Sequence, residues 1–208
     1  STLNMFRSFY PKDHSLQFAL LEGDSTDSTF EHVRNFADVV VKKDTHKPQF
    51  PSERSIERAV HLAQLRNLLT QTAVEHTSPD YIFWHDSHYM SNHRLLEELL
   101  DYLSFPEIDI IAPLALDSPN SFYDSWSYRD LNNREFTKQP PFSESIRNKE
   151  NNLVEVLSVG SVFLAKSEIW KRGARFGNTD NEKFLFHKNA KDLGYRVWLH
   201  TGLVTYHI

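Results

Sequence analysis

Short apolar runs alternate with stretches of helical periodicity along this chain, and that alternation restricts its fold more than any other feature. Leu16–Leu21 is followed by a helical start at Ser28, and Tyr81–Trp84 is followed by apolar residues at helical spacing over Leu95–Leu103. Strands that alternate with helices typically form a mostly parallel sheet with helices on both faces. We therefore predict an α/β fold whose ligands bind at the carboxyl ends of the strands.

The same periodicities place the other elements. Ser28 and Glu31 form a capping-box pattern at the start of one helix, and Gly194 ends the last helix. Ser118–Asn152 is aromatic and polar, and we expect a long ordered loop there. The expected strands are Leu16–Leu21, Val39–Val41, Tyr81–Trp84, Ile108–Ala112, Ser161–Ala165 and Tyr195–Leu199, and the expected helices begin at Ser28, Ile56, Leu95 and Glu182.

Composition excludes several classes of protein. With 208 residues, 39% of them hydrophobic, the chain can bury one core, so we expect a single domain over 1–208. Because the chain stops one residue after His207, we expect that this domain was excised from a longer chain. A net charge of −5 argues against nucleic acid as a partner, and no apolar run approaches the ~20 residues of a membrane segment. The absence of cysteine fits a reducing compartment, so we expect the cytoplasm, or the host cytoplasm for a viral protein.

A polar cluster follows the aromatic strand at Tyr81–Trp84. Asp86 and His88 are two residues apart where the chain leaves the strand, and both could turn toward one cation. An imidazole ligand favours manganese over magnesium. A solvated turn in which Asp86 caps the next helix explains the spacing equally well.

Several segments resemble GT-A glycosyltransferases, above all the fungal Golgi mannan mannosyltransferase subunits. Tyr81–His88 is similar to the strand and DxD motif of that family, and Ala63–Leu69 to the helix before it. Leu21–Thr29 is similar to the acidic loop after the second strand. Gly194–His207 is similar to the closing strand with its metal-binding histidine. The resemblance implies a GT-A fold that spans most of the chain.

The resemblance also implies a metal site. It adds His207 to Asp86 and His88 as a ligand of Mn2+, with Mg2+ as the alternative. Without the resemblance, His207 would be an ordinary histidine near a terminus. His88 stands where the family has its second aspartate, which keeps a ligand but changes its charge and softness. The first strand and nucleotide-contacting loop of the family should precede Leu3, and the sequence shows neither.

Nucleotide-binding residues follow from the same resemblance. Glu22, with Asp24 beside it, is placed where an acid can accept hydrogen bonds from uracil or guanine. The alternative is that Glu22, Asp24 and Asp27 only form a turn and a helix cap. Arg66 could contact either the diphosphate or the carboxylate of Asp86, and it could also be a surface arginine on an amphipathic helix.

Sugar and acceptor contacts are expected in two further places. In Tyr123–Asp130, similar to a YDxWxxRD segment of capsule-type mannosyltransferases, the sugar-binding candidates are Tyr123, Trp126 and Arg129, with Asp124 as a catalytic candidate. Aromatic residues that only fix the loop to the core are the alternative. Asp180 and Glu182 precede the last helix, where an inverting enzyme would have a general base. The resemblance favours retention, and a helix cap would also explain Asp180.

The resulting prediction is metal-dependent transfer of a hexose or deoxyhexose from a nucleotide-diphosphate sugar to a glycan of a glycoprotein. A further resemblance, to viral glycosyltransferases that decorate capsid proteins, implies UDP-glucose or UDP-rhamnose as donor, whereas the fungal one implies GDP-mannose. Two other classes stay open. A carbohydrate-binding module would bind sugar without nucleotide or metal, and a metal-dependent hydrolase would use water as its acceptor.

Overall fold

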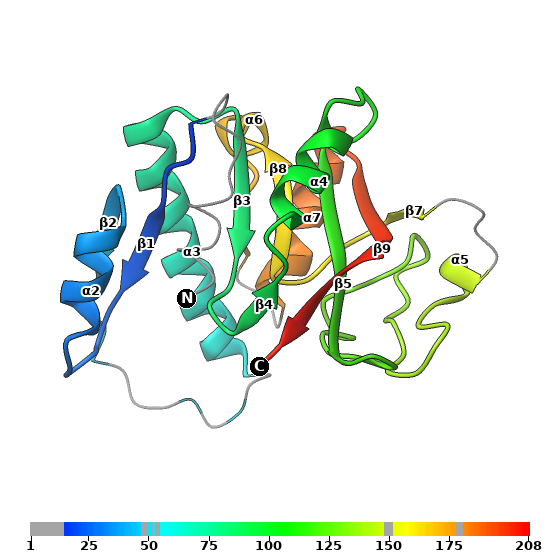
Figure 1. Ribbon diagram of the computed structural model, residues 1–208, viewed down its shortest axis with the longest axis horizontal. Coiled ribbons are helices and arrows are strands. Elements are labelled where there is room, and N and C mark those ends of the chain that lie inside the picture. The colour runs from blue at the N-terminus through cyan, green and yellow to red at the C-terminus, as the bar shows by residue number, and fades with distance from the viewer. Residues whose placement is uncertain (1–14, 47–49, 51, 53–54, 148–151, 178–180) are drawn as a thin grey trace.

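The computed structural model describes residues 15–46, 50, 52, 55–147, 152–177 and 181–208. Strands and helices alternate in most of this part, as Figure 1 shows. In chain order the elements are β1 (Ala19–Glu22), α2 (Thr29–Phe36), β2 (Val39–Lys42), α3 (Ile56–Thr77), β3 (Tyr81–His85), β4 (Tyr89–Ser91), α4 (Leu95–Leu103), β5 (Ile110–Ser118), β6 (Ser121–Phe122), α5 (Glu144–Arg147), β7 (Leu153–Val156), β8 (Val162–Lys166), α6 (Glu168–Lys171), α7 (Glu182–Asp192) and β9 (Val197–His207).

The described strands form two sheets. β1 and β2 pair in parallel, and a second sheet has the order β3-β8-β5-β9-β4, with β6 paired to β5 and β7 to β9. The α/β class is confirmed, but the expectation of a mostly parallel sheet is wrong. In the larger sheet β5 and β9 are parallel, whereas β8 is antiparallel to both β3 and β5. Between β5 and β8 the described chain holds β6, the four-residue helix α5 and β7, but not the long crossover helix that usually makes a parallel return.

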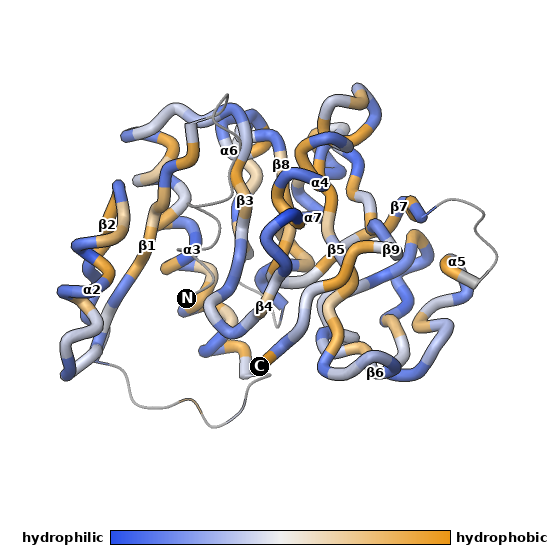
Figure 2. Tube along the Cα trace, viewed as in Figure 1, coloured by the Kyte–Doolittle hydropathy of each residue, from blue (hydrophilic) through white to orange (hydrophobic). Residues whose placement is uncertain are grey.

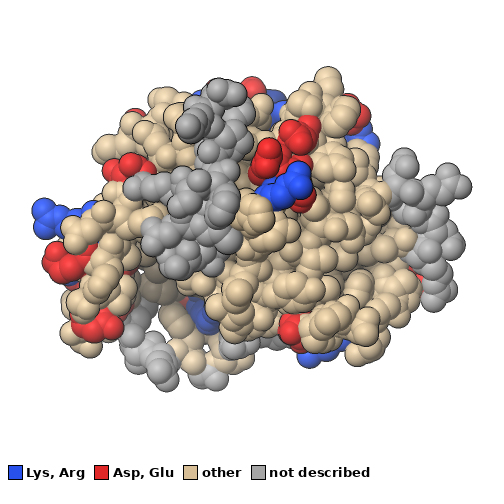
Figure 3. All heavy atoms as spheres, viewed as in Figure 1, with Lys and Arg blue, Asp and Glu red and all other residues tan. Residues whose placement is uncertain are grey.

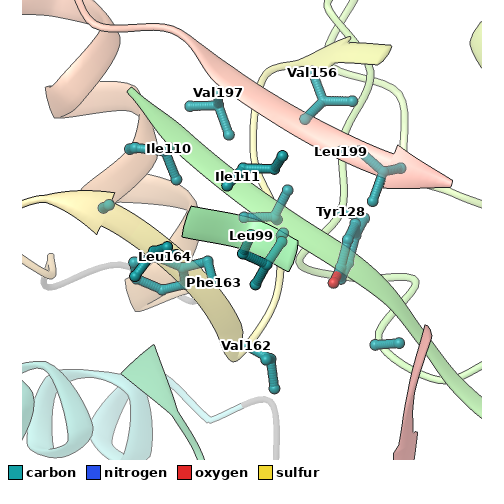
Figure 4. Close-up of a cluster of buried hydrophobic side chains, with 14 of the residues drawn as sticks. Leu99, Ile110, Ile111, Tyr128, Val156, Val162, Phe163, Leu164, Val197 and Leu199 are labelled. Atoms are coloured by element: carbon teal, nitrogen blue, oxygen red, sulfur yellow. The ribbon is translucent and has the colours of Figure 1, made fainter. Parts of the chain in front are cut away.

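The core lies along the larger sheet. Ile110, Ile111, Val162, Phe163 and Leu199 are fully or almost fully buried and pack together (Figure 4). Helix α4 packs on β5 and β8, while α3 packs on β1, β2 and α7 and so links the two sheets (Figure 1). Hydrophobic segments recur along these strands and helices in Figure 2. β3 pairs with β8, whose Val162 and Phe163 belong to this core, so the end of β3 is fixed to the larger sheet.

The surface charge and the helices of the described chain determine what a partner of one charge sign or a membrane would meet. On the face drawn in Figure 3, acidic and basic side chains form small mixed groups rather than one broad patch of a single sign. Among the described helices, none is both long enough and apolar enough to cross a membrane.

Helix ends follow local side-chain chemistry, with two differences from the sequence prediction. Ser28 makes no capping bond, and instead Asp27 Oδ1 accepts a hydrogen bond from the Thr29 amide at 2.9 Å. Asp27, one residue before the predicted cap Ser28, accepts the hydrogen bond from the free N–H group at the helix start. The prediction of a capping box at Ser28 and Glu31 is therefore wrong. At α7 the cap is Asn181, which accepts from the Phe184 amide at 3.0 Å. Gly194, with φ of +94°, ends α7 as predicted.

His187 gives the core a pH dependence that can be measured. It is fully buried on α7 against Phe163 and Phe186, and burial lowers its pKa to about 3. The unfolded chain takes up this proton below its ordinary pKa of 6.5, whereas the folded chain does not. The free energy of unfolding should therefore decrease as the pH is lowered, by about 1.4 kcal/mol per pH unit between roughly pH 6 and pH 4. This contribution to the slope should be missing in His187→Phe.

Urea denaturation of both proteins at several pH values measures the difference between their slopes. Parallel curves for the wild type and His187→Phe would show that His187 stays charged in the folded protein.

Candidate active site

Asp86 lies directly after β3 and is held by two side chains. Arg66 Nη2 on α3 donates to Asp86 Oδ2 at 2.8 Å, and the Trp84 indole N–H donates to Oδ1 at 2.9 Å. The Asp86 amide donates to the Ser161 carbonyl at 3.2 Å, which fixes the backbone beside β8. Arg66 and Asp86 have side chains that are only 9% and 14% exposed. The carboxylate therefore has one defined orientation.

The electrostatic surroundings keep Asp86 ionised. Burial alone would raise its pKa, but the positive charges of Arg66 and Lys183 and the hydrogen bonds from Arg66 and Trp84 outweigh it, so that the pKa lies well below its usual range. An ionised carboxylate at a strand end is a competent ligand for a hard or borderline cation.

A second ion pair adjoins the first. Lys183 Nζ lies 3.2 Å from Asp124 Oδ2 and donates to Ser161 Oγ at 2.8 Å. Glu182 Oε1 lies 3.5 Å from Arg66 Nε. Three carboxylates thus share two basic groups in a mostly buried cluster, which leaves one carboxylate in excess. Such an excess favours binding of a cation.

Two histidines lie next to this cluster. The ring centroids of His88 and His207 are 5.0 Å apart, and the His207 ring stacks on Tyr123 at 3.5 Å. β4 pairs with the end of β9 in a register that sets Tyr89 opposite His207, and the Ile208 amide donates to the His88 carbonyl at 3.0 Å. Burial lowers the pKa of His88, with opposing effects from Asp86 and His207. A neutral imidazole is the form that binds metals.

The predicted metal ligands fit a divalent cation by their chemistry. Each Asp86 oxygen accepts one hydrogen bond and has a second lone pair left. His88 and His207 add two imidazoles, a donor set that suits Mn2+. However, in the part of the chain that the structure describes, no three His, Cys, Asp or Glu side chains are gathered closely enough to hold a metal. Binding would require these side chains to close around the ion.

Glu22 and Asp24 lie in the loop after β1. Glu22 is 6% exposed, and its Oε1 accepts from the Ser25 amide at 3.2 Å. Asp24, at φ of +65°, accepts from the amides of Thr45 at 2.8 Å and His46 at 2.9 Å. The Asp24 carboxylate therefore ties this loop to the one after β2. β1, which ends at Glu22, packs on α3, the helix that carries Arg66.

The segment around Tyr123–Asp130 divides between the site and the loop. Asp124 belongs to the charge cluster and Tyr123 stacks on His207. The Trp126 carbonyl accepts from Asn181, and Arg129 binds Glu135 at 3.1 Å and lies over the Phe184 ring. These contacts of the Trp126 backbone and the Arg129 side chain hold the loop to its surroundings. Sugar binding by Trp126 and Arg129 stays a prediction.

The two acids predicted before α7 have different outcomes. Asp180 lies outside the described residues. Glu182 is 3% exposed and faces Arg66 inside the protein. Its carboxylate is therefore occupied by the same arginine that holds Asp86.

Sequence reasoning missed Trp84, Tyr89 and Lys183. Trp84 is two residues before Asp86, and side chains two apart in a strand share a face, so its indole contact could have been suspected. Lys183 follows the predicted Glu182 directly. Tyr89 gave no signal, because an aromatic residue in a short strand ordinarily belongs to the core.

An open depression of about 700 Å³ lies elsewhere, between α3 and α7, and includes none of the predicted site residues. Phe176 connects it to the site, since the Arg66 guanidinium lies over the Phe176 ring. We base the site on the charge cluster because chemically competent groups converge there.

Comparisons with known proteins give the fold. No protein-family model matches the chain, and no curated protein sequence matches it. Among solved structures, GalNAc-T7 with UDP, GalNAc and Mn2+ superposes with a TM-score of 0.63 at 12% identity, over 99% of this chain and 39% of that one. The mannosyltransferase PcManGT from Pyrobaculum calidifontis, in complex with GDP-Man and Mn2+, superposes with a TM-score of 0.56 at 15% identity, over 99% and 53%. This chain has the GT-A fold.

The GT-A likeness extends beyond sugar transfer. The inositol-1-phosphate CTP transferase from T. maritima also superposes on this chain, with a TM-score of 0.54 at 13% identity, over 100% of this chain and 76% of that one. The chain spans 39% and 53% of the two glycosyltransferases. The GT-A fold alone therefore leaves the reaction to be argued from the site.

Proposed function

We propose that this GT-A chain transfers a hexose or deoxyhexose from a nucleotide-diphosphate sugar to a glycan of a glycoprotein, with a divalent cation at Asp86. One observation carries the proposal. At the end of β3, Arg66 and Trp84 hold an ionised carboxylate beside two imidazoles. Ligands of α/β sheets bind at such strand ends.

The cation in this proposal is Mn2+, with Mg2+ as the alternative, held by Asp86, His88 and His207. When bound, it would neutralise the charge that develops on the leaving diphosphate. Two solved GT-A structures that resemble this chain contain Mn2+. The contact of Arg66 with Asp86 at 2.8 Å supports a role for Arg66 in orienting the carboxylate that would bind the cation.

The donor is proposed to be a UDP-sugar, UDP-glucose or UDP-rhamnose, in preference to GDP-mannose. Glu22 would accept hydrogen bonds from the base, and its low exposure fits a contact that excludes water. Tyr123, stacked on His207, would present its ring to the sugar. This preference rests on the resemblance to viral glycosyltransferases that decorate capsid proteins.

Retention of anomeric configuration is part of the proposal. An inverting enzyme needs a general base within reach of the acceptor hydroxyl. Of the acid candidates in the described part of the chain, Glu182 is buried against Arg66 and Asp124 is paired with Lys183, so neither is free to take that proton. This engagement of both acids supports retention.

A thermal-shift titration with UDP, GDP, UDP-glucose, UDP-rhamnose and GDP-mannose, each with and without Mn2+, tests the proposal. A ligand at 100 times its dissociation constant stabilises the native state by about 2.7 kcal/mol, so one nucleotide should raise the melting temperature by several degrees, and only with Mn2+. A shift with free sugar but with no nucleotide would identify a binding module. Cleavage of the donor by water, with no transfer to any glycan, would identify a hydrolase.

A further inference from the structure

A chain of side-chain hydrogen bonds joins three strands beside the candidate cation ligands. His85 Nε2, at the end of β3, lies 2.9 Å from Ser91 Oγ in β4. Ser91 Oγ lies 2.8 Å from Thr205 Oγ1 in β9. Ser91 and Thr205 are 9% and 0% exposed. Because the two hydroxyls are buried, water cannot replace a lost partner, and each bond of the chain is costly to break.

The direction of each bond in this chain is fixed. The Thr205 hydroxyl has one hydrogen atom and donates it to the Met90 carbonyl at 3.0 Å. Toward Ser91 it can therefore only accept, so the Ser91 hydroxyl donates to Thr205 Oγ1. Ser91 Oγ then accepts from the Nε2–H group of His85. Removal of the central hydroxyl thus leaves one donor and one acceptor without their partners.

The bond between His85 and Ser91 closes the turn that carries two candidate ligands. Asp86 follows His85 directly, and His88 lies three residues before Ser91. In the described sheet, β3 and β4 are at opposite ends of the strand order and are not paired with each other. The side-chain bond therefore closes this turn where backbone pairing between the two strands does not.

The bond between Ser91 and Thr205 ties the same turn to the third candidate ligand. β4 and β9 are antiparallel, with Ser91 opposite Thr205 and Tyr89 opposite His207. Thr205 and His207 are two residues apart in β9, so they share a face of the sheet. A slip of one residue would turn His207 to the other face. The hydroxyl bond therefore favours the register that directs His207 toward the site.

We propose that the His85–Ser91–Thr205 chain positions the candidate cation ligands by holding the ends of β3, β4 and β9 together. The three residues act through the backbone that carries the ligands, so they are positioning residues rather than catalytic ones. A site whose segments are assembled before the ion arrives loses less conformational entropy on binding. The inference rests on the proposed function, because it concerns the same cation site.

Ser91→Ala tests the chain, because it removes the central hydroxyl and little else. Isothermal titration with Mn2+ in the presence of UDP should show about tenfold weaker affinity for the ion than in the wild type. The matched control is Ser167→Ala. Ser167 is 2% exposed, and its hydroxyl donates to the Pro79 carbonyl just before the other end of β3. This control also loses a buried hydrogen bond but should keep the wild-type affinity.

Two substitutions at Thr205 separate the hydrogen bond from packing. Thr205→Val keeps the shape of the side chain and should weaken Mn2+ binding as Ser91→Ala does, whereas Thr205→Ser keeps the hydroxyl and should bind nearly as the wild type. The metal-free protein gives a second readout, because the Ile208 amide donates to the His88 carbonyl at 3.0 Å. Hydrogen exchange at this amide should be faster in Ser91→Ala and Thr205→Val than in Thr205→Ser.

The outcomes distinguish the positioning chain from the proposed function. Equal Mn2+ affinity of Ser91→Ala and Ser167→Ala in the presence of UDP would overturn the chain while the proposed function stands. Equal effects of Thr205→Val and Thr205→Ser would overturn it as well, since packing would then explain both. A wild type that binds no nucleotide with any cation would refute the proposed function, and the positioning role would fail with it.

Discussion

Replacing Arg66 with methionine is expected to lower the free energy of unfolding by about 3–5 kcal/mol. The Arg66 side chain is 9% exposed and forms ion pairs with two carboxylates. Its Nη2 lies 2.8 Å from Asp86 Oδ2, and its Nε lies 3.5 Å from Glu182 Oε1. Without Arg66, the carboxylates of Asp86 and Glu182 stay in a mostly buried space, where Lys183 is already paired with Asp124. Removing one member of a buried ion pair costs more than the pair contributes, because the remaining charge is left desolvated.

Equilibrium denaturation in urea measures this effect. The matched control is Arg34→Met on the exposed surface of α2, which should change the free energy of unfolding by less than about 0.5 kcal/mol. Combining Arg66→Met with Asp86→Asn and Glu182→Gln should recover part of the loss. If Arg66→Met costs no more than Arg34→Met, the buried charge cluster does not exist as described.

Asp86→Asn is expected to reduce nucleotide-sugar turnover by about 10³-fold, because it removes the ionised ligand while keeping the shape of the side chain. The amide is neutral, so the affinity for Mn2+ in the presence of nucleotide should fall as well. Arg66 keeps Glu182 as a partner, and the variant should stay folded.

The control for this variant is Asp101→Asn, an exposed aspartate on α4, which should keep full turnover. Circular dichroism and the melting temperature show whether Asp86→Asn is folded. Turnover above about one tenth of the wild-type rate in a folded Asp86→Asn protein would rule out a role for Asp86 as an essential cation ligand.

Long periodic segments of the fold could be predicted from the sequence. α3 and α4 begin where their apolar spacing begins, and β3 ends one residue after the predicted strand Tyr81–Trp84. Strand direction could not be predicted, because it depends on how the chain between β5 and β8 returns. β7 begins directly after the expected loop and was not predicted, because a four-residue strand carries too little periodicity to separate it from polar surroundings.

The site was predictable only where its residues are close in sequence. Asp86 and His88 follow directly from the strand that precedes them. The partner of Arg66 stayed open between the diphosphate and Asp86, because a contact between a helix and a strand depends on packing rather than on spacing. The same applies to Lys183 and Asp124, which are 59 residues apart, and to the stacking of Tyr123 on His207.

The most direct test of the central claim is a crystal structure with Mn2+ and the nucleotide diphosphate that stabilises the protein, recorded at the manganese absorption edge. We predict one anomalous peak bonded to the Asp86 carboxylate, the His88 and His207 imidazoles and the diphosphate oxygens. A peak elsewhere in the molecule, or nucleotide bound with no manganese at Asp86, would contradict the account.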